Sequence, residues 1–262
     1  MNRSLFVFFT ILLMMNIFPL KAQQLTGADE RAAQIIEDYE RWSAIRDDWA
    51  NLNRYREANK DAGLPNEGEK RVVFMGNSIT EGWSNHYPEF FEGKPYLNRG
   101  ISGQTTPQML VRFRQDVIDL EPDVVVILAG TNDIAGNTGP STISMITDNL
   151  FSMAELAHTH GIKVILSSVL PVYDFPWRPG LEPAQKIVEL NKRIQSYAAM
   201  SGHYYLDYFS ETADSRMGMK ENLAYDGVHP SREGYIVMSR LVEEAISAVM
   251  SNSGQASPPG VE

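Results

Sequence analysis

The sequence predicts an α/β fold in which helices cover both faces of a parallel sheet of about five strands. From residue 70 onward, short apolar runs alternate with longer segments of helical periodicity, which is typical of βαβ units. The chain has 262 residues, enough for one such domain with a sizeable core. Its 43% hydrophobic and 21% charged residues are ordinary for a globular protein and exclude a wholly disordered or collagen-like chain.

Residues 1–22 form a predicted secretory signal peptide. A short positive start at Asn2 and Arg3 precedes a nearly apolar run from Leu5 to Leu20, and the small residue Ala22 follows at the expected cleavage point. The alternative is a membrane anchor, but about 16 apolar residues are few for a hydrocarbon core of ~30 Å. We therefore expect a secreted or periplasmic protein that is cut near Ala22 and keeps no stable membrane anchor.

Residues 23–68 form a predicted helical extension followed by a linker. Between residues 28 and 61, apolar side chains such as Ala33, Ile36 and Tyr39 recur at three-residue steps with charged residues between them. A stripe of this kind is more typical of packing on the outside of a main domain than of a ligand site. The turn-forming residues 62–68 then predict the linker.

Residues 69–250 carry the predicted α/β domain. The expected strands, of which the second is the weakest, are residues 71–75, 96–98, 123–129, 162–169 and 203–206. The expected helices are residues 106–119, 141–160, 183–201 and 231–250. Residues 251–262 are polar and rich in proline and glycine, which predicts a disordered tail.

Composition limits the function further. The chain has no cysteine, which excludes disulfides, thiolate metal sites and a cysteine nucleophile. With 23 lysine and arginine residues against 33 aspartate and glutamate residues, its formal net charge is −10. A negative surface repels phosphate backbones, so nucleic acid is not an expected partner.

Residues whose side chains or backbone could take part in catalysis follow the predicted strands. Ser78 follows the first strand, Gly103 the second and Asn132 the third, while Asp226 and His229 lie in the loop before the last helix. Ligands bind outside the carboxyl ends of the strands in open α/β sheets, so these loops are expected to meet at one edge. Together they supply a nucleophile, a base, an orienting carboxylate and an oxyanion hole, the set that acyl transfer needs.

Each of these residues also has a simpler interpretation. A lone serine at a helix start is more often a cap, although its oxygen there lies near unpaired N–H groups and the positive end of the helix dipole.

Of the five histidines, His229 is the good candidate for a base because Asp226 lies three residues earlier and can reach the ring nitrogen facing away from Ser78. A metal site is disfavoured because no second histidine lies at helical metal spacing.

The expected oxyanion donors are the amide of Asn132 and the backbone N–H groups of Gly103 and Ser78. Glycine lacks a Cβ, so its N–H can approach a ligand closely. Taken singly, Gly103 is equally typical of a tight turn, and Asn132 of an Asx turn. Four matched sites in strand order make coincidence a poor explanation.

The four segments resemble the conserved blocks of the SGNH, or GDSL, hydrolases. The matching residues are Ser78 in GNSIT, Gly103 in NRGISGQTT, Asn132 in GTND and His229 in DGVHP, and the resemblance covers roughly residues 70–250. It implies a flavodoxin-like three-layer α/β/α fold and esterase chemistry without a metal or other cofactor. It also implies Ser78 as nucleophile, His229 as base and Asp226 as orienter, with the oxyanion held by Ser78, Gly103 and Asn132.

One position departs from the family pattern. Asn77 stands where the family usually has aspartate, and neutral hydrogen bonds from asparagine are expected to preserve the loop. The change puts in doubt any role that needs a charge at this position.

Substrate preference is predicted from the residues expected to surround the serine. A candidate specificity loop over residues 171–183 carries Tyr173, Trp177 and Arg178, and Asn77 and Trp83 complete the expected substrate pocket. Aromatic rings beside a polar group suit stacking on a sugar, and they equally suit a loop that packs on its own domain. Trp83 is expected in the core or the pocket wall.

We therefore expect a secreted enzyme that removes short acyl groups, acetyl foremost, from carbohydrate. The alternatives within the same chemistry are a lysophospholipase and a general short-chain carboxylesterase. A non-catalytic carbohydrate-binding module on the same fold and a metal-dependent phosphodiesterase are the alternatives of other classes. The sequence does not predict an oligomeric state.

Overall fold

The computed structural model describes residues 27–251, so the predicted signal peptide and residues 252–262 of the predicted tail lie outside the described residues. The chain divides into two compact units, Met1–Asp47 and Asp48–Glu262. In the first unit, helix α2 (Gly27–Asp47) is described, and its Ile36 and Tyr39 are exposed. Between residues 27 and 251, no helix combines the length and apolar character that crossing a membrane requires.

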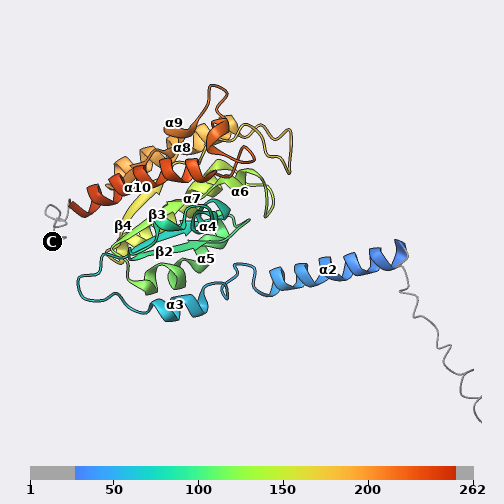
Figure 1. Ribbon diagram of the computed structural model, residues 1–262, viewed down its shortest axis with the longest axis horizontal. Coiled ribbons are helices and arrows are strands. Elements are labelled where there is room, and N and C mark those ends of the chain that lie inside the picture. The colour runs from blue at the N-terminus through green and yellow to red at the C-terminus, as the bar shows by residue number, and fades with distance from the viewer. Residues whose placement is uncertain (1–26, 252–262) are drawn as a thin grey trace, which may run out of the picture. The chain divides into compact units, whose positions relative to one another are not determined.

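The second unit is built on a sheet of five parallel strands in the order β2-β1-β3-β4-β5 (Figure 1). The strands are β1 (Val72–Gly76), β2 (Tyr96–Gly100), β3 (Val124–Leu128), β4 (Lys163–Ser167) and β5 (Tyr204–Leu206). The chain runs outward from β1 to β2 and returns to the other side of β1 to form β3, so the strand order reverses there. Such a reversal opens a crevice at the carboxyl ends of the two strands. The predicted parallel α/β fold is confirmed.

Helices cover both faces of this sheet because its strands are apolar on both sides. Val73 and Met75 of β1 point into one core cluster, while the alternating Val72 and Phe74 point into the other. The first cluster includes residues of α5 (Thr106–Asp116), α7 (Ile143–Thr159) and α8 (Ala184–Ser201), and the second those of α4 (Ser78–His86) and α10 (Arg232–Ser251). The short helices are α3 (Arg56–Ala62), α6 (Thr131–Ile134) and α9 (Tyr208–Thr212), and the 3₁₀ turns are η1 (Pro88–Phe90), η2 (Ile118–Leu120) and η3 (Glu221–Leu223).

The predicted helical stretch 28–61 is interrupted after Asp47. The carboxylate of Asp48 accepts hydrogen bonds from the backbone N–H groups of Leu52 (2.7 Å) and Asn53 (3.0 Å), which holds the chain in turns instead of a helix. Helical structure resumes only in α3.

The segment after Asp47 packs on the same unit as the sheet. Gln104, Gln108 and Gln115 each donate a side-chain hydrogen bond of 2.7 Å to its backbone, at the carbonyls of Ala50, Trp49 and Leu52 respectively. The compact unit that holds the sheet therefore begins at Asp48, ahead of residue 69, where the α/β domain is predicted to start.

Candidate active site

Ser78 stands where β1 ends and α4 begins. Asn77 caps the helix, because its side-chain oxygen accepts a hydrogen bond of 3.0 Å from the backbone N–H of Ile79. A neutral asparagine thus fills the acceptor role at this turn, as expected for the position where the family usually has aspartate. The cap places Ser78 at the first helical residue, with its oxygen near the positive end of the helix.

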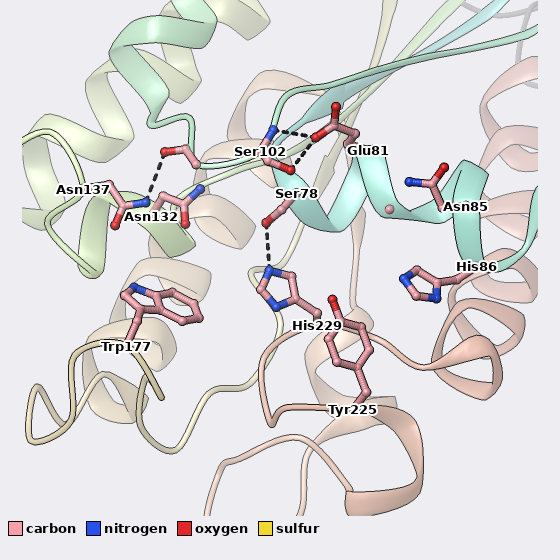
Figure 2. Close-up of a pocket in the computed structure, with 12 residues that line it drawn as sticks. Ser78, Glu81, Asn85, His86, Ser102, Asn132, Asn137, Trp177, Tyr225 and His229 are labelled. Carbon is pink, nitrogen blue, oxygen red and sulfur yellow. Dashed lines mark hydrogen bonds between the residues drawn. The ribbon is translucent and has the colours of Figure 1, made fainter. Parts of the chain in front are cut away.

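The structure brings Ser78, His229 and Asp226 into one hydrogen-bonded chain. The Oγ of Ser78 lies 2.9 Å from Nε2 of His229, a contact that is dashed in Figure 2, and Nδ1 of His229 lies 2.7 Å from Oδ2 of Asp226. The other carboxylate oxygen accepts hydrogen bonds from the backbone N–H groups of Val228 (2.9 Å) and His229 (2.7 Å). One side of the imidazole therefore faces a hydroxyl and the other a carboxylate that the loop itself holds in place.

The electrostatics of Asp226 favour its charged form. Burial raises the pKa of this carboxyl, but hydrogen bonds from the His229 and Val228 backbones and from the His229 ring outweigh burial and hold the pKa below its usual range. The carboxylate is therefore ionised at neutral pH. An ionised partner fixes the tautomer of His229 and stabilises its imidazolium form.

Gly103 and Asn132 line the same pocket as Ser78, which has a volume of about 440 Å³. Gly103 has a φ of +79°, which favours glycine, and a Cβ at this position would meet no heavy atom within 4 Å. Its backbone conformation, and not a close approach, therefore explains the glycine. The Nδ2 of Asn132 donates one hydrogen bond of 2.9 Å to the Gln104 carbonyl and carries a second hydrogen. This leaves the amide a donor for a ligand.

One face of α4 lines much of the pocket. Its residues Ser78, Glu81, Gly82, Asn85 and His86 recur at the three- and four-residue spacing of a helix face. Of the remaining lining residues, three were not predicted from the sequence, namely Ser102, Asn137 and Tyr225. The helical period counted from Ser78 would have found Glu81 and Asn85, whereas Tyr225, Asn137 and Ser102 are placed by the tertiary fold.

Hydrogen bonds to the Glu81 carboxylate hold the loop that carries Gly103 in place. One of its carboxylate oxygens accepts hydrogen bonds from the backbone N–H (2.9 Å) and the hydroxyl of Ser102, and the other from Arg54 (3.0 Å). Burial raises the pKa of Glu81, but the bonds from Ser102 and Arg54 outweigh it and hold the pKa below its usual range. An ionised Glu81 therefore ties the loop after β2 to helix α4.

Of the five predicted pocket residues, Trp177 lines the pocket, and its ring centroid lies 6.0 Å from that of His229. Asn77 is 1% exposed and occupied as the helix cap. Trp83 is equally buried, because it lies on the core face of α4, where its ring stacks on Phe90. Asn77 and Trp83 therefore do not line the pocket, and of the two places expected for Trp83 the structure shows the core.

Tyr173 and Arg178 do not line the pocket either. The guanidinium of Arg216 lies over the exposed ring of Tyr173, 5.1 Å from its centroid. Arg178 donates hydrogen bonds to the carbonyls of Ala135 (2.6 Å) and Gly136 (3.2 Å), just past the end of α6. Arg178 thus anchors the loop of Trp177 to the helix that carries Asn132, and it is not directed at a substrate.

In the described part of the chain, the histidine and carboxylate side chains are not clustered like the ligands of a metal ion. His229 is bonded to Ser78 and Asp226, and His86 ends α4 in the same pocket. Within the part of the chain that the structure describes, no three histidine or carboxylate side chains are placed to hold a metal ion.

Comparison with known proteins identifies the family. The model of the GDSL-like lipase/acylhydrolase family matches residues 74–237. A GDSL-like lipase from Bacteroides thetaiotaomicron is 48% identical, and its crystal structure covers 76% of this chain and 98% of its own with a TM-score of 0.75. Esterase TesA of Pseudomonas aeruginosa is 28% identical over 170 residues, 63% of this chain and 77% of TesA.

A lipoprotein of Bacillus subtilis, YqeF, is 33% identical over 130 residues. That match takes in 43% of this chain and 54% of YqeF, so the chain spans about half the length of this relative. The family match itself covers more than half of the chain and contains all the residues brought together at the pocket. The chain belongs to the GDSL-like lipase/acylhydrolase family and is an esterase or acylhydrolase of that type.

Proposed function

We propose that this protein is a serine esterase that removes short acyl groups, acetyl foremost, from the hydroxyl groups of carbohydrates. The observation that carries the proposal is the unbroken hydrogen-bonded chain from Ser78 through His229 to Asp226 at the wall of the pocket. The predicted signal peptide supports export to the periplasm or the medium, where polysaccharides are met. The chemistry assigned to the chain's own residues requires no cofactor.

The reaction begins when Oγ of Ser78 attacks the ester carbonyl and its proton passes to Nε2 of His229. The N–H groups of Ser78 and Gly103 and the amide of Asn132 hold the resulting oxyanion. Collapse of the tetrahedral intermediate breaks the bond to the alcohol, which takes the proton from His229. Water, deprotonated by His229, then attacks the acyl-enzyme, and Ser78 recovers its proton as the carboxylic acid leaves.

A short acyl group fits the end of the pocket that lies beyond Asn132. Asn137 donates a hydrogen bond of 3.2 Å to the Gly103 carbonyl at this end, and Trp177 lies below it in Figure 2. Arg178 fastens the adjoining loop to the carbonyls after α6. A long alkyl chain directed this way would meet hydrogen-bonded groups instead of an apolar channel.

Chain-length preference tests the acyl specificity. Among p-nitrophenyl esters, we expect kcat/KM to be highest for acetate and to fall with each longer acyl chain. The reason is that a longer chain would meet the hydrogen bond from Asn137 to the Gly103 carbonyl at the acyl end of the pocket. The series is measured from C2 to C12, with a lysophospholipid assayed in parallel. A preference for C8 or longer chains, or faster turnover of the lysophospholipid, would favour the lysophospholipase alternative.

Asn132 should stabilise the transition state more than it stabilises the bound substrate. Replacing it with alanine is expected to lower kcat for p-nitrophenyl acetate by roughly 10²- to 10³-fold with little change in KM, because the oxyanion loses a donor. Asn149→Ala is a matched control for loss of an amide, since Asn149 bonds Thr106 and Met145 outside the pocket. A loss that appears mainly in KM would contradict the oxyanion role.

A metal-dependent phosphodiesterase needs a bound metal ion for activity, whereas the proposed serine esterase does not. Ester hydrolysis that survives exhaustive treatment with a chelator would exclude it. Activity that is lost with the chelator and restored by a divalent cation would contradict the proposed mechanism.

A further inference from the structure

The pocket continues along α4 well past the nucleophile. Ser78 and Asn85 are seven residues apart on the same helix face. At a rise of 1.5 Å per residue, Asn85 therefore lies about 10 Å farther along the helix axis. His86 and Tyr225 belong to the same stretch of the lining. This length exceeds what a single acetylated sugar ring needs at Ser78.

The two ends of the cleft differ in character. Figure 2 shows Asn132, Asn137 and Trp177 on one side of the Ser78–His229 pair and Asn85, His86 and Tyr225 on the other. The oxyanion donors and the hydrogen bond from Asn137 to Gly103 occupy the first side. A bulky alcohol attached to the ester is therefore directed to the second side.

The second side offers several hydrogen-bonding groups. The ring of Tyr225 stacks on His229, with centroids 5.7 Å apart, and contacts His86 at 5.4 Å, so these imidazoles hold its orientation although the residue is 60% exposed. His86 in turn stacks on Tyr235 at 5.9 Å. The Tyr225 hydroxyl points toward the cleft in Figure 2, where Asn85 is also exposed. Hydroxyl, imidazole and amide groups can both donate and accept hydrogen bonds, as the hydroxyls of a sugar do.

The charge of the lining selects against an anionic alcohol. Glu81 lies between Ser78 and Asn85 on the helix face, and the residues that line the pocket include no lysine or arginine. A phosphate headgroup or a uronate would meet no lysine or arginine among these lining residues and would lie near the Glu81 carboxylate, whose charge Arg54 partly offsets. The occupant that fits is both hydroxyl-rich and uncharged.

We infer that Asn85, His86 and Tyr225 form a subsite for a neutral sugar ring next to the ring that bears the ester, so that the enzyme acts on oligosaccharides in preference to monosaccharides. This inference rests on the proposed carbohydrate esterase function and specifies where the leaving alcohol is held. Only the hydroxyl of Tyr225 serves the subsite, because its ring packs on the catalytic histidine.

The test compares acetylated methyl xyloside with acetylated xylotriose, each carrying one acetyl group on the same hydroxyl of its terminal or only ring. For the wild type, we expect kcat/KM to be at least tenfold higher for the trisaccharide, mainly through a lower KM. Asn85→Ala and Tyr225→Phe should each reduce this ratio about three- to tenfold, since each removes a hydrogen-bonding group from the subsite. Gln195→Ala, an exposed amide on α8 outside the pocket, should leave the ratio unchanged.

Two negative outcomes are distinguishable. Equal kcat/KM values for the two sugars in the wild type, or ratios unchanged in both Asn85→Ala and Tyr225→Phe, would overturn the subsite and leave the carbohydrate esterase function standing. No acetate release from either sugar, in a preparation that hydrolyses p-nitrophenyl acetate, would overturn the proposed function and the subsite with it.

Discussion

Ser78→Ala is expected to lower kcat for p-nitrophenyl acetate by roughly 10⁴- to 10⁶-fold, while the protein stays folded. The substitution removes one oxygen, whose hydrogen-bond partner is Nε2 of His229, and alanine is well tolerated in the first turn of a helix. His229 then has no nucleophile to activate, and only the oxyanion donors remain. Initial rates corrected for hydrolysis in buffer measure the effect, and thermal unfolding followed by circular dichroism verifies the fold.

Ser247→Ala is the matched control, because Ser247 is exposed on α10 and lies outside the pocket. A fluorophosphonate should label the wild type and the control at Ser78 and leave Ser78→Ala unlabelled. Folded wild-type protein that neither reacts with the probe nor hydrolyses the ester would favour a non-catalytic binding module. Substantial turnover by folded Ser78→Ala would instead remove Ser78 from its role.

The sequence predicted the parallel sheet and the residues at its carboxyl edge because both follow from local patterns. An apolar run that ends in a polar loop marks the end of a buried strand, and the geometry of βαβ units puts all such ends on one side. Ser78 and Asn132 follow β1 and β3, between which the strand order reverses. Asp226 and His229 were found together because a short loop keeps neighbours in sequence close in space.

The walls of the pocket could not be predicted in the same way. An aromatic residue near the serine can face the core or a ligand, and which face of α4 is buried depends on the packing of α10. Trp83 lies on the face that packs against α10, where its Nε1 donates a hydrogen bond of 3.2 Å to Ser239. Tyr225 lines the pocket although it is distant from Ser78 in sequence. Contacts across the tertiary fold decided both positions.

The start of the compact unit could not be predicted from local sequence patterns either. Residues 49–52 are held by hydrogen bonds from glutamine side chains in and just before α5. Neither the spacing nor the type of these glutamines distinguishes them from solvated residues on a helix surface.

Arg112 should be as important for stability as Ser78 is for turnover. This arginine of α5 is fully buried and donates hydrogen bonds to the Gln104 side chain (2.6 Å), the Asp116 carboxylate (3.0 Å) and the Gly76 carbonyl (3.0 Å). Gly76 ends β1 just before Ser78, and the Gln104 carbonyl accepts the hydrogen bond from Asn132. One buried cation thus joins the turn of the nucleophile to the loop of the oxyanion hole.

Arg112→Met is expected to lower the free energy of unfolding by about 3–5 kcal/mol, because it leaves Asp116 charged and buried without its partner. Asp116 keeps a hydrogen bond of 2.7 Å from Asn59 and an electrostatic attraction to Arg99, neither of which replaces the direct ion pair with Arg112. Urea unfolding measures the change. Arg114→Met on the same helix is the matched control, since its side chain is 61% exposed and lies 3.7 Å from Asp119, and a change within about 0.5 kcal/mol is expected.

The double variant Arg112→Met/Asp116→Leu separates an uncompensated charge from lost packing. Replacing a buried ion pair with apolar side chains of similar size is often neutral, so the double variant should recover much of the stability that Arg112→Met loses. Its kcat should stay below that of the wild type, because Gly76 and Gln104 still lack their donor and the two loops are no longer joined. Equal losses of stability in the single and double variants would show that the buried charge of Asp116 does not cause the stability loss in Arg112→Met.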